Sequence, residues 1–226
     1  MQIKILGISG SPIKAGNTEL YLKEALKAAE SAAEGVTTQF ISLAGKKILD
    51  CIHCNWCLAK QTKEKPCALE DDMGGFYPQI VSADGYIFAT PTYIGRLTGQ
   101  MASFLDRFRC LGHGGAFHGS LRNKPAGALT VIWVRNCGAE IALLTLDMGA
   151  LTCDMLPVGL GLEGGQLGAV GVTSFGGTGK FDPKDKHLVL KDEFGMDCAR
   201  AMGKRVVEVT RLIKAGQEAL NEVPKH

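Results

Sequence analysis

Four cysteines that could bind a metal lie close together in this chain of 226 residues: Cys51, Cys54, Cys57 and Cys67. Thiolates spaced two residues apart converge in one loop, and a fourth ligand can come from further along the chain. This pattern suits a [4Fe–4S] cluster or a tetrahedral zinc ion. A redox disulfide and free thiols would use the same residues, so the spacing leaves all of these alternatives open.

The loop over residues 9–18, with the sequence SGSPIKAGNT, is a second candidate site. It follows an apolar run that predicts a strand and precedes a helical pattern, so the free N–H groups and the positive end of that helix point into the loop. A simple helix cap is the plainer interpretation, but a loop this long and this rich in hydroxyl groups favours a phosphate site. No Walker-type Gly-Lys-Ser/Thr follows, which argues against a nucleotide triphosphatase.

A third candidate is the segment over residues 91–95, with the sequence PTYIG, after the third predicted strand. Ligands of doubly wound sheets bind at the carboxyl ends of the strands, beside the point where the strand order reverses. Pro91 and Gly95 would shape a loop against which a flat ring can lie, with Tyr93 alongside. Taken by itself, the segment is better explained as a plain turn with a half-buried tyrosine.

The elements that must position these residues alternate along the chain. The predicted strands cover residues 2–8, 36–43, 85–90, 126–134 and 168–173, and the predicted helices cover 18–33, 72–82, 99–110, 139–154 and 192–214. This alternation predicts a parallel sheet with helices on both faces. In the first helix, Glu19 and Lys23 are expected to point outward as an i,i+4 pair.

These features together resemble a known family. Loop 9–18, segment 91–95, the residues at 98–101 and 106–107, and the cysteine segment ending in Asp71-Asp72-Met73 resemble the NADPH-dependent FMN reductase branch of the flavodoxin-like superfamily. Within that branch the chain is most similar to the iron–sulfur flavoproteins, from residue 1 to about residue 173. One departure is the fourth cysteine, which follows the third more closely in those relatives than the nine intervening residues here.

The resemblance implies the fold and the cofactor contacts. It implies an α/β flavodoxin-like domain over residues 1–226, with five parallel strands in the order 2-1-3-4-5 and a cysteine insertion at about 48–72 after the second strand. The expected contacts of the FMN phosphate are Ser9, Ser11, Lys14, Gly16, Asn17 and Thr18. Lys14 is the candidate cation, because many relatives have an arginine where this chain has Ile13. The expected contacts of the isoalloxazine ring are Pro91, Thr92, Tyr93, Ile94, Gly95, Arg135, Asn136 and Gly138. No side chain is assigned a catalytic acid or base role.

The overall charge excludes some classes of partner. With 25 basic and 23 acidic residues and a net charge of +2, the chain lacks the electrostatic footprint of nucleic-acid or membrane binding.

Its apolar stretches are shorter than the ~20 residues that cross a bilayer, and a strand beginning at residue 2 leaves no room for a secretion signal. We therefore expect a cytoplasmic protein in which the scattered cysteines are core residues, namely Cys110, Cys137, Cys153 and Cys198.

One main functional prediction and two alternatives follow. The main prediction is an FMN-dependent oxidoreductase that relays electrons between a [4Fe–4S] cluster and FMN. Its partner would be a small redox protein or a small-molecule electron acceptor, and the resemblance implies a homodimer or homotetramer. The first alternative is a cluster-free reductase of FMN or a quinone that uses NAD(P)H; whether the main candidate also uses NAD(P)H directly stays open. The second is a non-enzymatic interaction module stapled by zinc, against which loop 9–18 counts.

Overall fold

Six parallel strands form the central sheet in the part of the chain that the structure, a computed structural model, describes: residues 1–162, 164–181 and 183–222. The strands are β1 (Ile3–Ser9), β2 (Val36–Ser42), β3 (Gly85–Pro91), β4 (Pro125–Ile132), β5 (Leu156–Val158) and β6 (Ala169–Val172). They lie in the order β2-β1-β3-β4-β5, and β6 also pairs with β4. All of these pairings are parallel. The flavodoxin-like fold predicted from the sequence is confirmed.

The place of the fifth strand is shared by β5 and β6. β5 pairs with residues 125–127 of β4, and β6 pairs with residues 129–132. Between β5 and β6 the chain leaves the sheet, and a Cβ on Gly159 would lie 2.0 Å from the carbonyl oxygen of Gln166. The sequence predicted the strand at 168–173 but missed β5, because three residues that include Pro157 carry little strand pattern.

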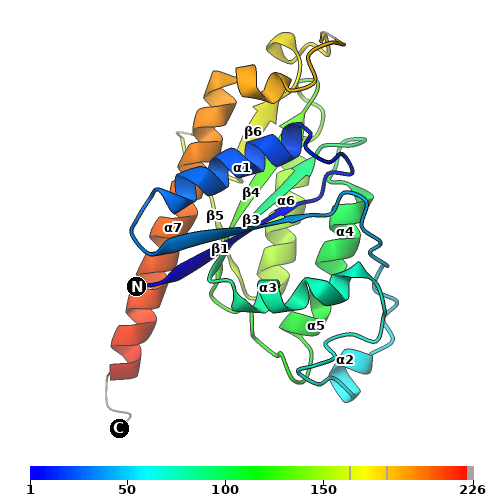
Figure 1. The fold of residues 1–226 in the computed structure, drawn as a ribbon, viewed down its shortest axis with the longest axis vertical. Helices are drawn as coiled ribbons and strands as arrows, with labels where there is room; N and C mark the ends of the chain where they lie inside the picture. Colours follow the sequence, from blue (N-terminus) through cyan, green and yellow to red (C-terminus); the bar gives the residue numbers. More distant parts are fainter. Residues whose placement is uncertain (163, 182, 223–226) are drawn as a thin grey trace.

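Helices cover both faces of the sheet (Figure 1). On one face, α1 (Asn17–Glu30) packs against α7 (Glu193–Glu222), and the other face carries α3 (Tyr77–Ser82), α4 (Gly99–Asp106) and α6 (Ala139–Thr152). The side chains of β1 explain this arrangement, because successive residues of a strand point to opposite faces. Ile3 and Ile5 enter the core beneath α1 and α7, whereas Leu6 and Ile8 enter the core on the opposite face.

Short helices occupy the connections. They are α2 (Trp56–Ala59), α5 (Arg109–Gly112) and the 3-10 helices η1 (Asp72–Gly75), η2 (Phe175–Gly177) and η3 (Leu188–Lys191). Two helices predicted as continuous are therefore broken: 72–82 becomes η1 and α3, and 99–110 becomes α4 and α5, with Arg107 at the break. Among the described residues, no helix combines the length and the apolar character needed to cross a membrane.

Candidate functional site

The first loop connects β1 to α1 at the carboxyl edge of the sheet. Gly16, the residue before α1, makes no side-chain cap hydrogen bond, so the first-turn amides of α1 face a loop in which their own helix offers them no acceptor. The Ser11 hydroxyl accepts a 3.1 Å hydrogen bond from the Ile13 amide, and the Ser9 hydroxyl accepts one of 3.4 Å from the Ser11 amide. Ser9, Ser11 and Thr18 are buried. These bonds hold the loop in a fixed shape, and the uncapped first-turn amides of α1 are the donors that suit an anion.

The prediction that the Glu19 side chain points outward is wrong. The sequence predicted an outward side chain paired with Lys23, but Glu19 is only 2% exposed. Its carboxylate accepts a 2.8 Å hydrogen bond from the Ala15 amide and another from the Ser42 hydroxyl. Ala15 has a φ of 54°, a left-handed conformation that is unfavourable for alanine. The buried carboxylate thus holds the loop in its path and takes up one amide that a ligand would otherwise meet.

Asn17 joins the first loop to a segment that the sequence analysis did not assign. Its Nδ2 donates a 3.0 Å hydrogen bond to the Lys186 carbonyl, and its Oδ1 accepts one of 3.1 Å from the Val189 amide. One hydrogen on Nδ2 remains for a ligand. The adjoining pocket of about 730 Å³ has a lining that includes Lys14, Gly16, Asn17, Trp133, Phe181 and His187.

The loops that follow β3 and β4 touch each other. In the first, Tyr93 and Arg96 exchange backbone hydrogen bonds of 2.8 and 3.2 Å, and Ile94 and Gly95 have φ values of 48° and 75°, as in a tight turn. In the second, Gly138 packs so closely that a Cβ there would lie 2.3 Å from the Gly95 carbonyl oxygen. The structure therefore brings Gly138 against the 93–95 segment.

The other predicted ring contacts lie in the same two loops. Pro91 is buried at the end of β3, and the Thr92 hydroxyl lies 2.9 Å from the Thr130 hydroxyl. Arg135 and Asn136 are exposed in the loop after β4. A flat ligand at this edge would meet backbone from both loops and side chains that face solvent.

Thr98 links the first loop to the loop after β3. Its hydroxyl donates a 2.7 Å hydrogen bond to the Gly10 carbonyl and accepts one of 3.1 Å from the Met101 amide at the start of α4. The predicted phosphate and ring contacts thus share one edge of the sheet, although they come from three separate stretches of sequence (Figure 1).

The four clustered cysteines line one small cavity, and Cys110 lines it as a fifth thiol. Cys54 is exposed, Cys51 and Cys67 are half-buried, and Cys57 and Cys110 are buried. The prediction that Cys110 is a buried residue is right, but it lies among the clustered thiols rather than apart from them. Sequence spacing gave no sign of this contact, because Cys110 follows Cys67 by more than forty residues.

The cysteine segment is held by its backbone and by one glutamine. His53 and Asn55, which flank the second cysteine, have φ values of 52° and 58°, so the chain turns sharply there with residue types that tolerate left-handed values. Gln61 donates from Nε2 to the carbonyls of Pro66 and Cys110 at 2.8 and 2.7 Å. These bonds fasten the segment to the chain beyond α4.

Burial makes two of the thiols weaker acids. It raises the pKa of Cys57, a shift that the nearby Arg109 guanidinium opposes. It raises the pKa of Cys110 to about 12. The Cys110 thiol donates a 3.1 Å hydrogen bond to the Arg107 carbonyl. Because metals bind the thiolate form, Cys110 is better suited to be a protonated neighbour of the ligands than a ligand.

Arg107 lines the same cavity and is 2% exposed. Its Nη1 donates a 2.6 Å hydrogen bond to the Asp71 carboxylate and one of 3.0 Å to the Leu49 carbonyl. Asp71 also accepts a 2.8 Å hydrogen bond from the Leu49 amide. These contacts tie the two ends of the cysteine segment together. The Nε and Nη2 groups of Arg107 are buried and have no hydrogen-bond partner within the described part of the chain.

The cavity is not a preformed site for a single ion. Within residues 1–162, 164–181 and 183–222, no three His, Cys, Asp or Glu side chains form a group that could hold a metal ion. The cavity volume is about 20 Å³, close to what one or two water molecules need. Its chemistry nevertheless suits a cluster, because thiols stand beside a buried cation with unpaired donors. A multi-atom cluster would require the wall that carries the exposed Cys54 to move outward.

The helix α4 connects the two candidate sites. It begins at Gly99 beside the loop after β3, and Arg107 caps its other end. At 1.5 Å per residue this helix is ~12 Å long. Midway, the Ser103 hydroxyl donates to the carboxylate of Asp50, the residue before the first cysteine. In Figure 1, α2 of the cysteine segment lies below α4, on the side away from the first loop.

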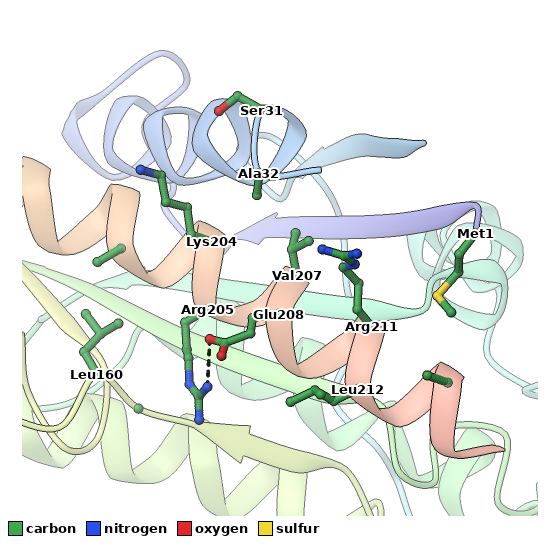
Figure 2. Close-up of a pocket in the computed structure, with 13 residues that line it drawn as sticks. Met1, Ser31, Ala32, Leu160, Lys204, Arg205, Val207, Glu208, Arg211 and Leu212 are labelled. Carbon is green, nitrogen blue, oxygen red and sulfur yellow. Dashed lines mark hydrogen bonds and ion pairs between the residues drawn. The ribbon is translucent and has the colours of Figure 1, made fainter. Parts of the chain in front are cut away.

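A larger hollow lies apart from both sites. It is a groove of about 940 Å³ along α7, and the residues labelled around it in Figure 2 include Met1, Leu160, Lys204, Val207, Arg211 and Leu212. Arg205 and Glu208 form a 2.8 Å ion pair at its edge. Its described lining contains none of the predicted phosphate, ring or cysteine ligands.

Comparison with known proteins agrees with this arrangement. The sequence matches the model of the family described as NADPH-dependent FMN reductase over residues 3–162. An iron-sulfur flavoprotein of Methanocaldococcus jannaschii is 37% identical over 212 residues, covering 94% of this chain and 100% of the relative. An iron-sulfur flavoprotein of Archaeoglobus fulgidus is 37% identical over 206 residues, covering 91% of this chain and 96% of the relative.

A solved structure shows the same fold at low sequence identity. The structure of RosB with bound 8-demethyl-8-formylriboflavin-5'-phosphate has a TM-score of 0.70 and 16% identity to this chain, and the match covers 99% of this chain and 89% of RosB. The family match extends over most of the chain, and the relatives span nearly all of it. The chain therefore belongs to the NADPH-dependent FMN reductase family and is a flavin-dependent oxidoreductase.

Proposed function

We propose that this protein relays electrons between FMN and a [4Fe–4S] cluster carried by the cysteine segment. FMN takes up a hydride as an electron pair and releases electrons singly, whereas a cubane cluster passes one electron at a time. The pair would connect a two-electron donor, for which NAD(P)H is the candidate, with a small redox protein or a small-molecule electron acceptor. The separation of the sites by one short helix supports direct exchange within a subunit.

The first loop would hold the FMN phosphate. Support comes from the uncapped start of α1 at Gly16 and from the buried hydroxyls of Ser11 and Thr18. Asn17 would add its remaining Nδ2 hydrogen, and the exposed Lys14 would supply a positive charge. Glu19 would act indirectly by holding the loop open at Ala15 rather than by touching the phosphate.

The loops after β3 and β4 would hold the isoalloxazine ring. The contact between Gly95 and Gly138 supports a common surface for it. Tyr93 and Ile94 are exposed on one loop, and Arg135 and Asn136 are exposed on the other. Covering the Tyr93 and Ile94 side chains with the ring would remove apolar surface from water.

The main support for a cluster is that four cysteines and a buried arginine line the same cavity. Cys51, Cys54, Cys57 and Cys67 all line it, and so does the buried guanidinium of Arg107. A cluster with four thiolate ligands is negatively charged, and a buried cation beside it lowers the electrostatic cost of that charge. The cluster-free reductase remains the alternative, and it is favoured by the absence of a metal-holding group among the described side chains.

We also propose that the protein is a homo-oligomer in which α6 packs against α6 of a second copy. The outward face of α6 carries Ile141, Leu144, Met148 and Leu151, which are between 43% and 54% exposed. Their spacing of three, four and three residues is that of a heptad seam. A seam of this kind needs a helix with matching spacing, and a second copy supplies one.

Spectroscopy of three proteins tests the cluster assignment. Anaerobically purified wild type should show broad visible absorbance that dithionite bleaches in addition to the flavin bands. Cys57→Ser should lose the broad absorbance and keep the flavin. Cys198→Ser is the matched control, because Cys198 is a buried thiol on α7 in the core on the other face of the sheet. Visible absorbance that consists of the flavin bands alone in all three proteins, with no broad component, would favour the cluster-free reductase.

A further inference from the structure

We propose that Arg107 donates hydrogen bonds from Nε and Nη2 to sulfur atoms of the cluster, and that these bonds raise the reduction potential of the cluster. This inference rests on the proposed function and adds a residue beyond the four cysteines. It assigns Arg107 a positioning and tuning role, in addition to the ion pair that closes the cysteine segment.

One edge of the Arg107 guanidinium has no hydrogen-bond partner in the described part of the chain. An arginine has five N–H donors in a fixed plane. In Arg107 the Nη1 group donates hydrogen bonds to the Asp71 carboxylate and to the Leu49 carbonyl. The Nε and Nη2 groups are buried and have no acceptor in the described part of the chain. Buried donors are almost always paired, so two orphaned ones on a single side chain point to an acceptor that the protein chain itself does not provide.

Sulfur atoms in the cysteine-lined cavity are the acceptors within reach of this edge. Arg107 lines the cavity together with five cysteines. A neutral thiol is a weak acceptor, which explains why the thiols do not satisfy the guanidinium. Thiolate and sulfide sulfurs carry negative charge, and hydrogen bonds between charged partners are the strong ones. The orphaned donors therefore fit a charged sulfur cluster better than free thiols.

Hydrogen bonds from Arg107 would change the reduction potential of the cluster. Reduction adds negative charge to a cluster, and N–H donors to its sulfur atoms stabilise the reduced form more than the oxidised form. The ion pair with Asp71 fixes the guanidinium in place, with the two side chains 1% and 0% exposed. Because the donors do not have to be reoriented when the electron arrives, their effect on the potential is retained in full.

A pair of substitutions at two cavity arginines tests this role. Arg107→Lys keeps the charge but lacks the planar fork of donors. Arg109→Lys is the matched control, because Arg109 also lines the cavity but is only partly buried and donates from Nη2 to Asn55 at 2.7 Å. In an anaerobic redox titration of the cluster-loaded proteins, Arg107→Lys should keep its iron and sulfide content and shift the midpoint potential to a more negative value. Arg109→Lys should shift it much less.

A second measurement keeps the proposal testable if Arg107→Lys does not fold. The Arg109→Lys variant leaves Arg107 as the arginine that lines the cavity. When this variant is labelled with ¹⁵N-arginine, pulsed electron paramagnetic resonance should show ¹⁵N coupling between Arg107 and the reduced cluster. A loaded cluster with no ¹⁵N coupling, or with equal potentials in wild type and Arg107→Lys, would overturn the role of Arg107 and leave the proposed function standing. Wild-type protein that takes up no iron and sulfide on reconstitution would overturn both.

Discussion

Arg107 and Asp71 form a 2.6 Å ion pair in which the two side chains are 1% and 0% exposed. The partners are 36 positions apart in sequence. The four clustered cysteines precede both partners and lie between Leu49, whose carbonyl also accepts from Arg107, and Asp71. Asp71 also accepts hydrogen bonds from the amides of Leu49 and Met73. The pair therefore joins the start of the cysteine segment, its end and the C-terminal end of α4 at one buried point.

Removing one partner of this pair should strongly destabilise the fold. Asp71→Asn leaves the Arg107 charge buried without its counter-ion, and we expect the free energy of unfolding to fall by about 3–5 kcal/mol. Glu70→Gln is the control, because its 3.4 Å pair with Lys65 is exposed, with side chains 87% and 50% exposed. It should lose less than about 1 kcal/mol. Urea denaturation measures both, and equal losses would contradict the structural role of the buried pair.

The first loop should determine the affinity for FMN. Ser11→Ala combined with Asn17→Ala removes two donors to a charged phosphate, each worth about 1.5–3 kcal/mol, so affinity should fall by about 100-fold or more. Ser31→Ala at the other end of α1, where the hydroxyl donates to the Ala28 carbonyl, should leave it unchanged. Fluorescence titration of the apoprotein with FMN gives both values. Wild-type affinity in the double variant would mean that the phosphate binds elsewhere.

The outward face of α6 should hold copies of the chain together. Leu144→Lys combined with Met148→Lys places two charges in the proposed seam, and light scattering should then give the mass of a monomer. Leu212→Lys, at an exposed position on α7, should keep the mass of the wild-type oligomer. A monomeric wild type with FMN bound would contradict the oligomer, and an unchanged mass in the double variant would place its interface elsewhere.

Asp147 on α6 should make stability depend on pH. Burial raises its pKa from an ordinary value of 3.8 to about 7. Within that window the folded protein holds a proton that the unfolded chain releases, so the stability of the fold decreases as pH rises from about 4 to 7. Asp147→Asn should remove this decrease and exceed wild-type stability at pH 8. Glu140→Gln, on an exposed side chain of the same helix, should retain it. Thermal unfolding across pH 4–8 would show parallel curves for all three proteins if Asp147 had no role.

The strands and the main helices could be predicted from sequence because their signals are local. The alternating apolar runs of β1 to β4 and the stripe of α1 depend on neighbouring residues, and the predicted segments match the observed ones closely. β5 was missed because three residues provide too short a pattern. Glu19 was predicted to be exposed because its local spacing with Lys23 is that of a surface pair; only the Ala15 amide and Ser42, which lies on β2, explain its burial.

The site residues that the sequence analysis missed depend on distant contacts. Nothing local distinguishes Arg107 from a surface arginine, because its burial depends on Asp71 and Leu49, 36 and 58 positions away. Asn17 was predicted as a phosphate contact one residue before the helix, but its contacts with Lys186 and Val189 span 169 and 172 positions. Motif spacing locates the loops of a site, whereas the segments that close over them are set by the whole fold.

In the proposed electron relay, one chain carries both FMN and a cluster on Cys51, Cys54, Cys57 and Cys67. The iron, acid-labile sulfide and FMN content of wild-type protein purified or reconstituted without oxygen tests this relay at its cofactors. We expect about four iron atoms and four sulfides for each FMN. FMN with neither iron nor sulfide, and with all four thiols free or paired as disulfides, would contradict it and identify the protein as a cluster-free flavin reductase.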